Sequence, residues 1–238
     1  MTTVRPLSAV LTTQGSAVGK MLLALLAVLT PSMPLSAQSP QAHWLHAGAM
    51  PPGAIGSHRL LRGGPLFGYT QPVELRAPEG ISLAIDSSGC YEQAEERLVV
   101  GLSVGPVYRF MATGVPGFPG VEVYPTVELI DRLYPPAGKE LEFPLPIELT
   151  AEDLRLAAQG ALVTRVVYVE NPQDALPLDE VNGQQRFDAR PGDDPLVLAD
   201  ELGRPVAIVR LGTRRPEVNQ DPRFSSPVML TGFEGTSP

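Results

Sequence analysis

Prolines and glycines cut this chain into short segments, and this punctuation limits the folds that are open to it. The 238 residues include 26 Pro and 23 Gly. Proline lacks the amide donor that a helix interior requires, and glycine loses the most backbone entropy there. A helical bundle and a coiled coil are therefore excluded. Because 43% of the residues are hydrophobic, burial can offset the entropy of ordering the chain. We expect a turn-rich globular domain.

Between these breaks lie short segments with β-strand character. They either alternate apolar and polar residues with a period of two or form apolar runs rich in valine and aromatic residues. The segments are 73–76, 81–86, 97–104, 107–113, 121–129, 141–149, 162–169 and 206–211. The first four are neighbours in pairs, separated by short breaks that contain proline and glycine, so they predict two hairpins.

Two of these segments also predict which side chains face solvent. In 121–129 the apolar positions share one face, and the other face is predicted to be solvent-exposed. This outward face carries Glu122, Tyr124, Thr126 and Glu128. In 141–149 two prolines fall on the outward face, so this segment is predicted to lie at a sheet edge, where a missing amide donor is tolerated.

Two short helices are predicted, and a strand follows each of them directly. Thr150 and Asp153 have the spacing of a capping box before a helix that ends at Gly160. Asp194 as N-cap, Pro195 in the first turn and Gly203 past the end repeat the plan. The expected fold is mainly β, an antiparallel β-sandwich of Ig-like or similar type with two short connecting α-helices. A barrel remains an alternative, because strand counts read from a pattern are approximate.

The beginning of the chain has the order of a secretory signal peptide. Arg5 and Lys20 precede the apolar run 21–29, and a small-residue stretch broken by prolines leads to Ala37. At about 1.5 Å per residue, such a run covers less than half of a hydrocarbon core about 30 Å thick. Cleavage after Ala37 is therefore favoured over a retained anchor, and no stable transmembrane span is expected afterwards. The expected location is the periplasm or cell envelope.

The single cysteine bears on lipid anchoring, and the patterns together predict how the chain is divided. The one cysteine, Cys90, is far from the cleavage point, so the exported chain is not expected to be lipid-anchored. The predicted divisions are a signal peptide at 1–37, an extended Pro/Gly-rich leader at 38–65, a β-sandwich domain at 66–212 and a flexible tail at 213–238.

The charge balance argues against nucleic acid as a partner. The chain has 18 basic and 26 acidic residues, a net charge of −8. Its longest basic run is Arg214-Arg215, whereas phosphate backbones require clustered cations. Sixteen of the 18 basic residues are arginine, since Lys20 and Lys139 are the only lysines.

The sequence lacks the motifs of the common catalytic sites. The patterns G-x-S-x-G and H-E-x-x-H, a glycine-rich phosphate loop, and a histidine near a serine or cysteine nucleophile are all absent. Neither a catalytic residue nor a cofactor is predicted. Outward carboxylate pairs, Glu122 with Glu128 and Glu142 with Glu148, leave a hydrolase as the least favoured alternative.

Two groups of residues are weak candidates for metal binding. His43, His46 and His58 lie in the breaker-rich leader, where a flexible segment is the simpler interpretation. The densest cluster of oxygen ligands consists of Asp179, Glu180, Asn182, Asp188 and Asp193. Val181 interrupts the ligand spacing of a calcium loop, so solvated carboxylates and a helix cap are preferred.

Two resemblances bear on function. Residues 187–203, with a Pro-Gly-Asp turn, a helix rich in leucine and alanine, and a closing glycine, resemble the first half of a LysM module. This resemblance implies peptidoglycan binding through 187–211, although the second half of the module has no counterpart after Leu211 and helix caps explain the same residues. The stretches 61–65, 132–136, 148–154 and 203–208 resemble uncharacterised exported proteins of planctomycete bacteria, which implies export but no activity. We therefore expect a non-catalytic envelope protein, either structural or a protein-interaction module, with envelope proteins or peptidoglycan as partners.

Overall fold

The structure is a computed structural model that describes residues 50–63, 67–87, 90–93, 96–171, 188–190, 193–215 and 223–230. The chain divides into two compact units, Met1–Gln41 and Ala42–Pro238, and all described residues belong to the second. The predicted signal cleavage at Ala37 therefore lies outside the described residues.

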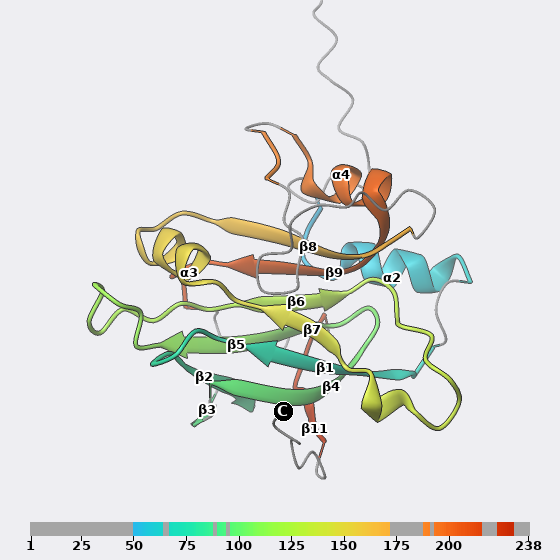
Figure 1. Ribbon diagram of the computed structural model, residues 1–238, viewed down its shortest axis with the longest axis horizontal. Helices are drawn as coiled ribbons and strands as arrows, with labels where there is room; N and C mark the ends of the chain where they lie inside the picture. Colours follow the sequence, from blue (N-terminus) through green and yellow to red (C-terminus); the bar gives the residue numbers. More distant parts are fainter. Residues whose placement is uncertain are drawn as a thin grey trace, which may run out of the picture. The chain divides into compact units, whose positions relative to one another are not determined.

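Most of the regular structure in this unit is β-strand (Figure 1). The helices are α2 (Ala54–Leu61), the 3₁₀ turn η1 (Glu140–Glu142), α3 (Ala151–Ala158) and α4 (Pro195–Leu202). The strands are β1 (Thr70–Arg76), β2 (Ser82–Ser87), β3 (Cys90–Gln93), β4 (Arg97–Ser103), β5 (Val107–Thr113), β6 (Thr126–Leu129), β7 (Leu145–Glu148), β8 (Val163–Glu170), β9 (Gly203–Leu211), β10 (Phe224–Ser225) and β11 (Val228–Met229).

The strands form two sheets, which confirms the predicted mainly β, sandwich-like fold. The smaller sheet has the order β11-β4-β1-β7, and the larger has the order β3-β2-β5-β6-β9-β8 with β10 beside β5. All pairings are antiparallel except β1 with β7 and β5 with β10. The larger sheet does not close on itself, so the barrel alternative is wrong.

The main hydrophobic core takes side chains from both sheets. Val73 of β1 and Leu102 of β4 belong to the same buried cluster as Phe110 of β5 and Val209 of β9. A second, smaller cluster lies on the other face of the larger sheet, where α2 and α4 pack; it contains Ile55, Ile130, Leu196 and Ile208. Burial on both faces explains why β9 reads as a nearly continuous apolar run.

The two predicted hairpins are wrong. β1 pairs with β4 and β7, whereas β2 pairs with β3 and β5, so the break at 77–81 carries the chain from one sheet to the other. β4 and β5 likewise lie in different sheets. A period of two shows which face of a strand is buried, but it does not show which strand is the neighbour.

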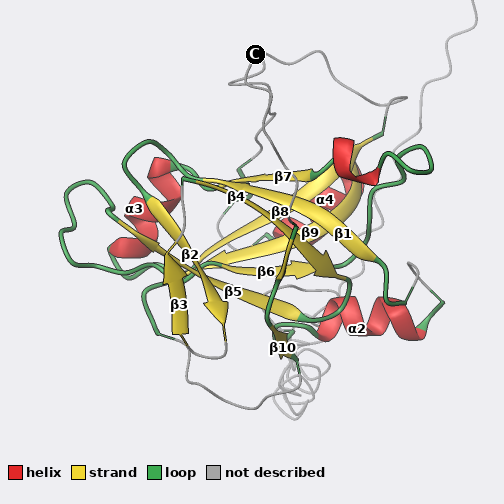
Figure 2. Ribbon diagram, turned by 90° about the horizontal axis from the view of Figure 1, so that it is seen from below, coloured by secondary structure: helices red, strands yellow, loops and turns green. Residues whose placement is uncertain are grey.

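The prediction that one face of 121–129 is exposed to solvent is also wrong. The strand there is confined to β6, Thr126–Leu129, and Glu128 is completely buried. The helix α2 covers this face, and Figure 2 shows it beside the sheet that contains β5 and β6. Sequence reasoning placed 54–61 in an extended leader and therefore missed the helix that excludes solvent here.

Other local predictions are confirmed. The Thr150 hydroxyl accepts a hydrogen bond of 3.1 Å from the amide of Asp153, and the Asp194 carboxylate accepts one of 2.9 Å from the amide of Leu196. β7 lies at an edge of the smaller sheet with Pro146 exposed, as predicted.

The prediction of a flexible tail is wrong for the described part of that segment. Within 223–230, β10 pairs with β5 and β11 pairs with β4.

Candidate functional site

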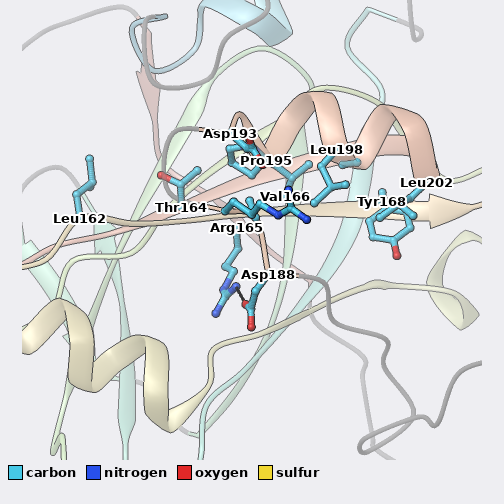
Figure 3. A pocket seen from close by; sticks show the side chains of 13 residues that line it. Leu162, Thr164, Arg165, Val166, Tyr168, Asp188, Asp193, Pro195, Leu198 and Leu202 are labelled. Atoms are coloured by element: carbon cyan, nitrogen blue, oxygen red, sulfur yellow. Dashed lines mark hydrogen bonds and ion pairs between the residues drawn. The ribbon is translucent and has the colours of Figure 1, made fainter.

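The candidate site is a groove of about 340 Å³ between β8 and α4 (Figure 3). Apolar side chains from both elements and a few charged groups line it. The lining residues are Leu162, Thr164, Arg165, Val166, Tyr168, Asp188, Ala189, Arg190, Asp193, Pro195, Leu198, Ala199 and Leu202. This volume is at the lower end of the range for small-ligand pockets, about 300–1,000 Å³.

Helix α4 is anchored by local chemistry and by its buried face. The Asp194 cap and Pro195 at the first position begin the helix, and Leu196 packs into the smaller hydrophobic cluster. On the neighbouring face, Leu198 and Leu202 line the groove. The sequence thus holds α4 on the sheet by one stripe of residues and leaves a second apolar stripe for the groove.

A glycine brings the far end of the groove close to β8. Gly203, the first residue of β9, lies so near β8 that a Cβ atom there would be 2.3 Å from the carbonyl oxygen of Val169. The pairing of β8 with β9 also shifts register between Val167 and Tyr168. The combination of a bulge and a close backbone approach redirects the end of β8, where Tyr168 lines the groove.

Arg165 connects the groove to α3. Its Nη2 lies 2.6 Å from Asp153 Oδ1. Its Nη1 lies 3.2 Å from Asp188 Oδ1, the ion pair that Figure 3 shows as a dashed line. The hydrogen bonds to Asp153 raise the pKa of the Arg165 guanidinium most strongly, with a smaller contribution from Asp188, and together they outweigh the effect of burial. Arg165 is therefore a fixed positive charge whose partner Asp188, 87% exposed, can be displaced by a ligand.

The structure accounts for part of the predicted oxygen cluster. Asp188 and Asp193 both line the groove, whereas Asp179, Glu180 and Asn182 lie outside the described residues. His43 and His46 also lie outside them, and His58 is on α2. Within the described ranges, no group of three or more histidine, cysteine, aspartate or glutamate side chains is placed to hold a metal ion. Cys90, on β3, is an exposed free thiol.

Of the two carboxylate pairs considered for hydrolysis, the pair of Glu122 with Glu128 is not arranged as predicted, because Glu128 is buried. Buried Glu128 accepts hydrogen bonds from the Gly56 amide at 3.0 Å and from Arg210 at 3.1 Å, so a substrate cannot reach it. Glu122 accepts a hydrogen bond from the Tyr124 hydroxyl. Glu142 forms an exposed ion pair with Lys139.

Sequence reasoning missed a set of buried carboxylates that each bind arginine. These pairs are Glu74 with Arg76 and Arg97, Asp86 with Arg109, Glu128 with Arg210, Asp131 with Arg204, and Asp153 with Arg165. Burial raises the pKa of Glu74, but the two arginines together outweigh it and lower that pKa below its usual value. The excess of arginine over lysine was the available signal, because the planar guanidinium suits buried ion pairs better than an ammonium does.

Comparisons of the chain with protein-family models, curated proteins and solved structures found no match. Among the described residues, none of the helices combines the length and apolar character that a membrane crossing requires.

Proposed function

We propose that this protein is an exported, non-catalytic component of the cell envelope that works as a protein-interaction module through the groove between β8 and α4. The observation that carries the proposal is the lining of this groove: an apolar wall on α4 faces alternate side chains of a strand at the end of the sheet. The basic leader and apolar run before Ala37 support export.

The shape of the groove suits an extended peptide segment. From Leu162, just before β8, to Tyr168 the lining runs along six residue steps of extended chain, roughly 20 Å at about 3.3 Å per residue. Thr164, Val166 and Tyr168 line it at every second position, so they can separate the alternate side chains of an extended partner. β8 pairs with β9 alone among the described strands. The proposed partner is therefore an extended protein segment with an apolar anchor.

The charges at the groove suit binding better than proton transfer. The lining includes two arginines, Arg165 and Arg190, and two aspartates, Asp188 and Asp193, so its formal charge is balanced. Arg165 is held by Asp153, a buried carboxylate that it neutralises. A partner that displaces Asp188 would bring its own carboxylate to Arg165, which gives the site selectivity for sequence.

Photocrosslinking in the intact exporting cell tests this proposal. A photoreactive residue at position 198, inside the groove, should form a crosslink to a discrete envelope protein. The same residue at position 197, which is 39% exposed on α4 but outside the groove lining, should not. Equal crosslinking from both positions, or none from position 198, would contradict the proposed interaction site.

Peptidoglycan binding through 187–211 is the second candidate function. It is favoured by one observation: eight of the described residues of this segment, all between 188 and 202, contribute one wall of the groove. Purified protein should then sediment with insoluble peptidoglycan. Leu198→Ser should reduce the sedimented fraction and Val197→Ser should not, whereas protein left entirely in the supernatant rejects this function.

A further inference from the structure

A stack of arginine and tyrosine side chains lies where α2, the start of β1 and the start of β9 meet. The guanidinium carbon of Arg132 is 4.6 Å from the ring centroid of Tyr69 and 4.4 Å from that of Tyr134. Arg204 also lies over Tyr134, at 5.2 Å. Stacking of this kind fixes the plane of a guanidinium and leaves its N–H donors directed to the edge.

Asp131 holds the other arginines of this stack in position. Its Oδ2 lies 2.7 Å from Arg204 Nη1 and 3.7 Å from Arg59 Nη1, and its Oδ1 accepts a hydrogen bond from the backbone amide of Arg132. Arg204 also donates to the carbonyl oxygen of Arg132 at 3.0 Å. Arg59 and Arg204 are each about one-third exposed, so their remaining donors reach solvent.

Arg132 differs from the other half-buried arginines of the described residues. Six arginines of the described residues are half-buried, and the five besides Arg132 have a carboxylate within 4.0 Å: Arg59, Arg109, Arg165, Arg204 and Arg210. Among the described residues no ion pair is found for Arg132; its guanidinium stacks on the rings of Tyr69 and Tyr134, and its buried Nε lacks a hydrogen-bond partner. The hydroxyl of Tyr69 is also buried without a partner. Leaving buried donors unpaired costs stability, so each of these groups needs a structural or functional explanation.

The charge of the cluster identifies the class of ligand. The cluster holds three guanidinium groups, those of Arg59, Arg132 and Arg204, and the one carboxylate of Asp131, so its formal charge is +2 on a chain whose net charge is −8. A phosphate monoester carries about −1.5 to −2 charges near pH 7 and three acceptor oxygens, so it matches this excess better than a single carboxylate does. Guanidinium groups also bind phosphate oxygens in a bidentate manner.

We propose that Arg132, with Arg59 and Arg204 beside it, forms a binding site for the oxyanion of a phosphate group. Tyr69 and Tyr134 orient the Arg132 guanidinium, and Asp131 orients its two neighbours. The Asp131 carboxylate is already engaged by Arg204 and by the Arg132 amide, which limits its repulsion of the ligand. The site shares no residue with the lining of the groove, and the proposal does not rest on the proposed partner of the groove.

Isothermal titration calorimetry of the purified exported protein tests the site, with inorganic phosphate and phenyl phosphate as probes at constant ionic strength. Both should bind with saturable heat. Tighter binding of phenyl phosphate supports a phosphate monoester as the ligand, and equal binding supports free phosphate. Arg132→Gln should weaken binding by about tenfold or more, because hydrogen bonds to a charged group are lost.

Two further variants separate ligand binding from folding and from general charge. Arg132→Lys keeps the charge but lacks the planar fork, and it should bind more weakly than the unmodified chain at an unchanged melting temperature. Arg155→Gln removes an exposed arginine from α3, outside the cluster, and should bind normally. Absence of saturable heat with both probes, or equal weakening by Arg155→Gln and Arg132→Gln, would overturn the proposal.

Discussion

Glu128 joins two parts of the chain that are far apart in sequence. Its Oε1 accepts the hydrogen bond of the Gly56 amide in the first turn of α2, and its Oε2 accepts that of Arg210 on β9. Gly53, the N-cap of this helix, supplies no side-chain hydrogen bond. A carboxylate near a helix N-terminus satisfies a free amide and interacts favourably with the helix dipole. Glu128 therefore performs from β6 the task that a local side chain performs in α3 and α4.

Removing this charge should destabilise the protein. Glu128→Gln leaves the Arg210 guanidinium buried without its counter-charge, and such a loss typically costs about 3–5 kcal/mol. Urea denaturation followed by circular dichroism measures the free energy of unfolding. Glu142→Gln, at an exposed ion pair, should change it by less than about 1 kcal/mol. Equal stability of the two variants would show that Glu128 is not essential to the packing of α2.

Tyr124 should make the protein sensitive to alkali. Burial, followed by the hydrogen bond that Tyr124 donates to Glu122, raises the pKa of its phenol to about 12. The unfolded chain ionises near the ordinary tyrosine value of about 10. The folded state binds the proton more tightly, so this contribution to stability is present below pH 10 and is lost as pH rises through about 12.

Unfolding free energies measured at pH 8, 10 and 11 check this expectation. Tyr124→Phe should reduce the decline in stability above pH 10, because phenylalanine does not ionise. Tyr134→Phe should retain that decline, since Tyr124 remains intact. If Tyr124→Phe follows the unmodified chain at every pH, another group causes the alkaline loss.

The helix α2 lies very close to the sheet that it covers. A Cβ atom at Gly56 would lie 2.7 Å from the carbonyl oxygen of Leu129 and 2.9 Å from the Cα of Gly105. Both contacts are with backbone, so side-chain rotation cannot relieve them. A glycine inside a helix is normally unfavourable, and this one is explained by the close approach.

Gly56→Ala should therefore destabilise the protein even though alanine is the better helix former. Overpacking against backbone typically costs about 1–3 kcal/mol. Ser57→Ala, at the next and exposed position of the same helix, should be neutral or slightly stabilising. Thermal denaturation of the two variants makes the comparison, and a melting temperature that is raised in both would contradict the packing described for α2.

The contrast between helices also shows what the sequence could predict. Thr150 and Asp194 cap α3 and α4 from adjacent positions, so those helices were recognisable in the sequence. The cap of α2 lies 72 residues away, and no local pattern could reveal it. For the same reason α4 could be predicted as an element, but the groove could not, since its other wall is β8. The stack of Tyr69 on Arg132 likewise joins residues that only the fold brings together.

The last described residues of the chain form strands in both sheets. The carbonyl of Arg223 accepts a hydrogen bond of 2.7 Å from Val107, and Phe224 lies beneath the Arg109 guanidinium at 4.4 Å. Further on, β11 forms the edge of the smaller sheet next to β4. Period-two alternation cannot be detected in strands of two residues, which explains why 213–238 read as a tail.

Truncation should reveal this contribution. A chain ending at Arg215 loses β10 and β11, and at about 0.5–1.5 kcal/mol for each hydrogen bond it should lose about 2–4 kcal/mol of stability. A chain that ends at Leu230 keeps both strands and should match the full-length protein. Chemical denaturation of the three proteins measures the difference, and equal midpoints would mean that these strand pairings add nothing.

The distant cap of α2 also determines when the chain can fold during its synthesis. Residues 54–61 emerge first during synthesis, yet their helix depends on Glu128 and on an arginine at position 210. β9, which lies between β6 and β8, is also among the last strands to be made. Because α2 contacts residues that are made much later, and contacts between distant residues also form slowly, folding must largely wait until most of the chain has been made. A chain threaded through a membrane pore would thus remain unfolded until nearly all of it had passed.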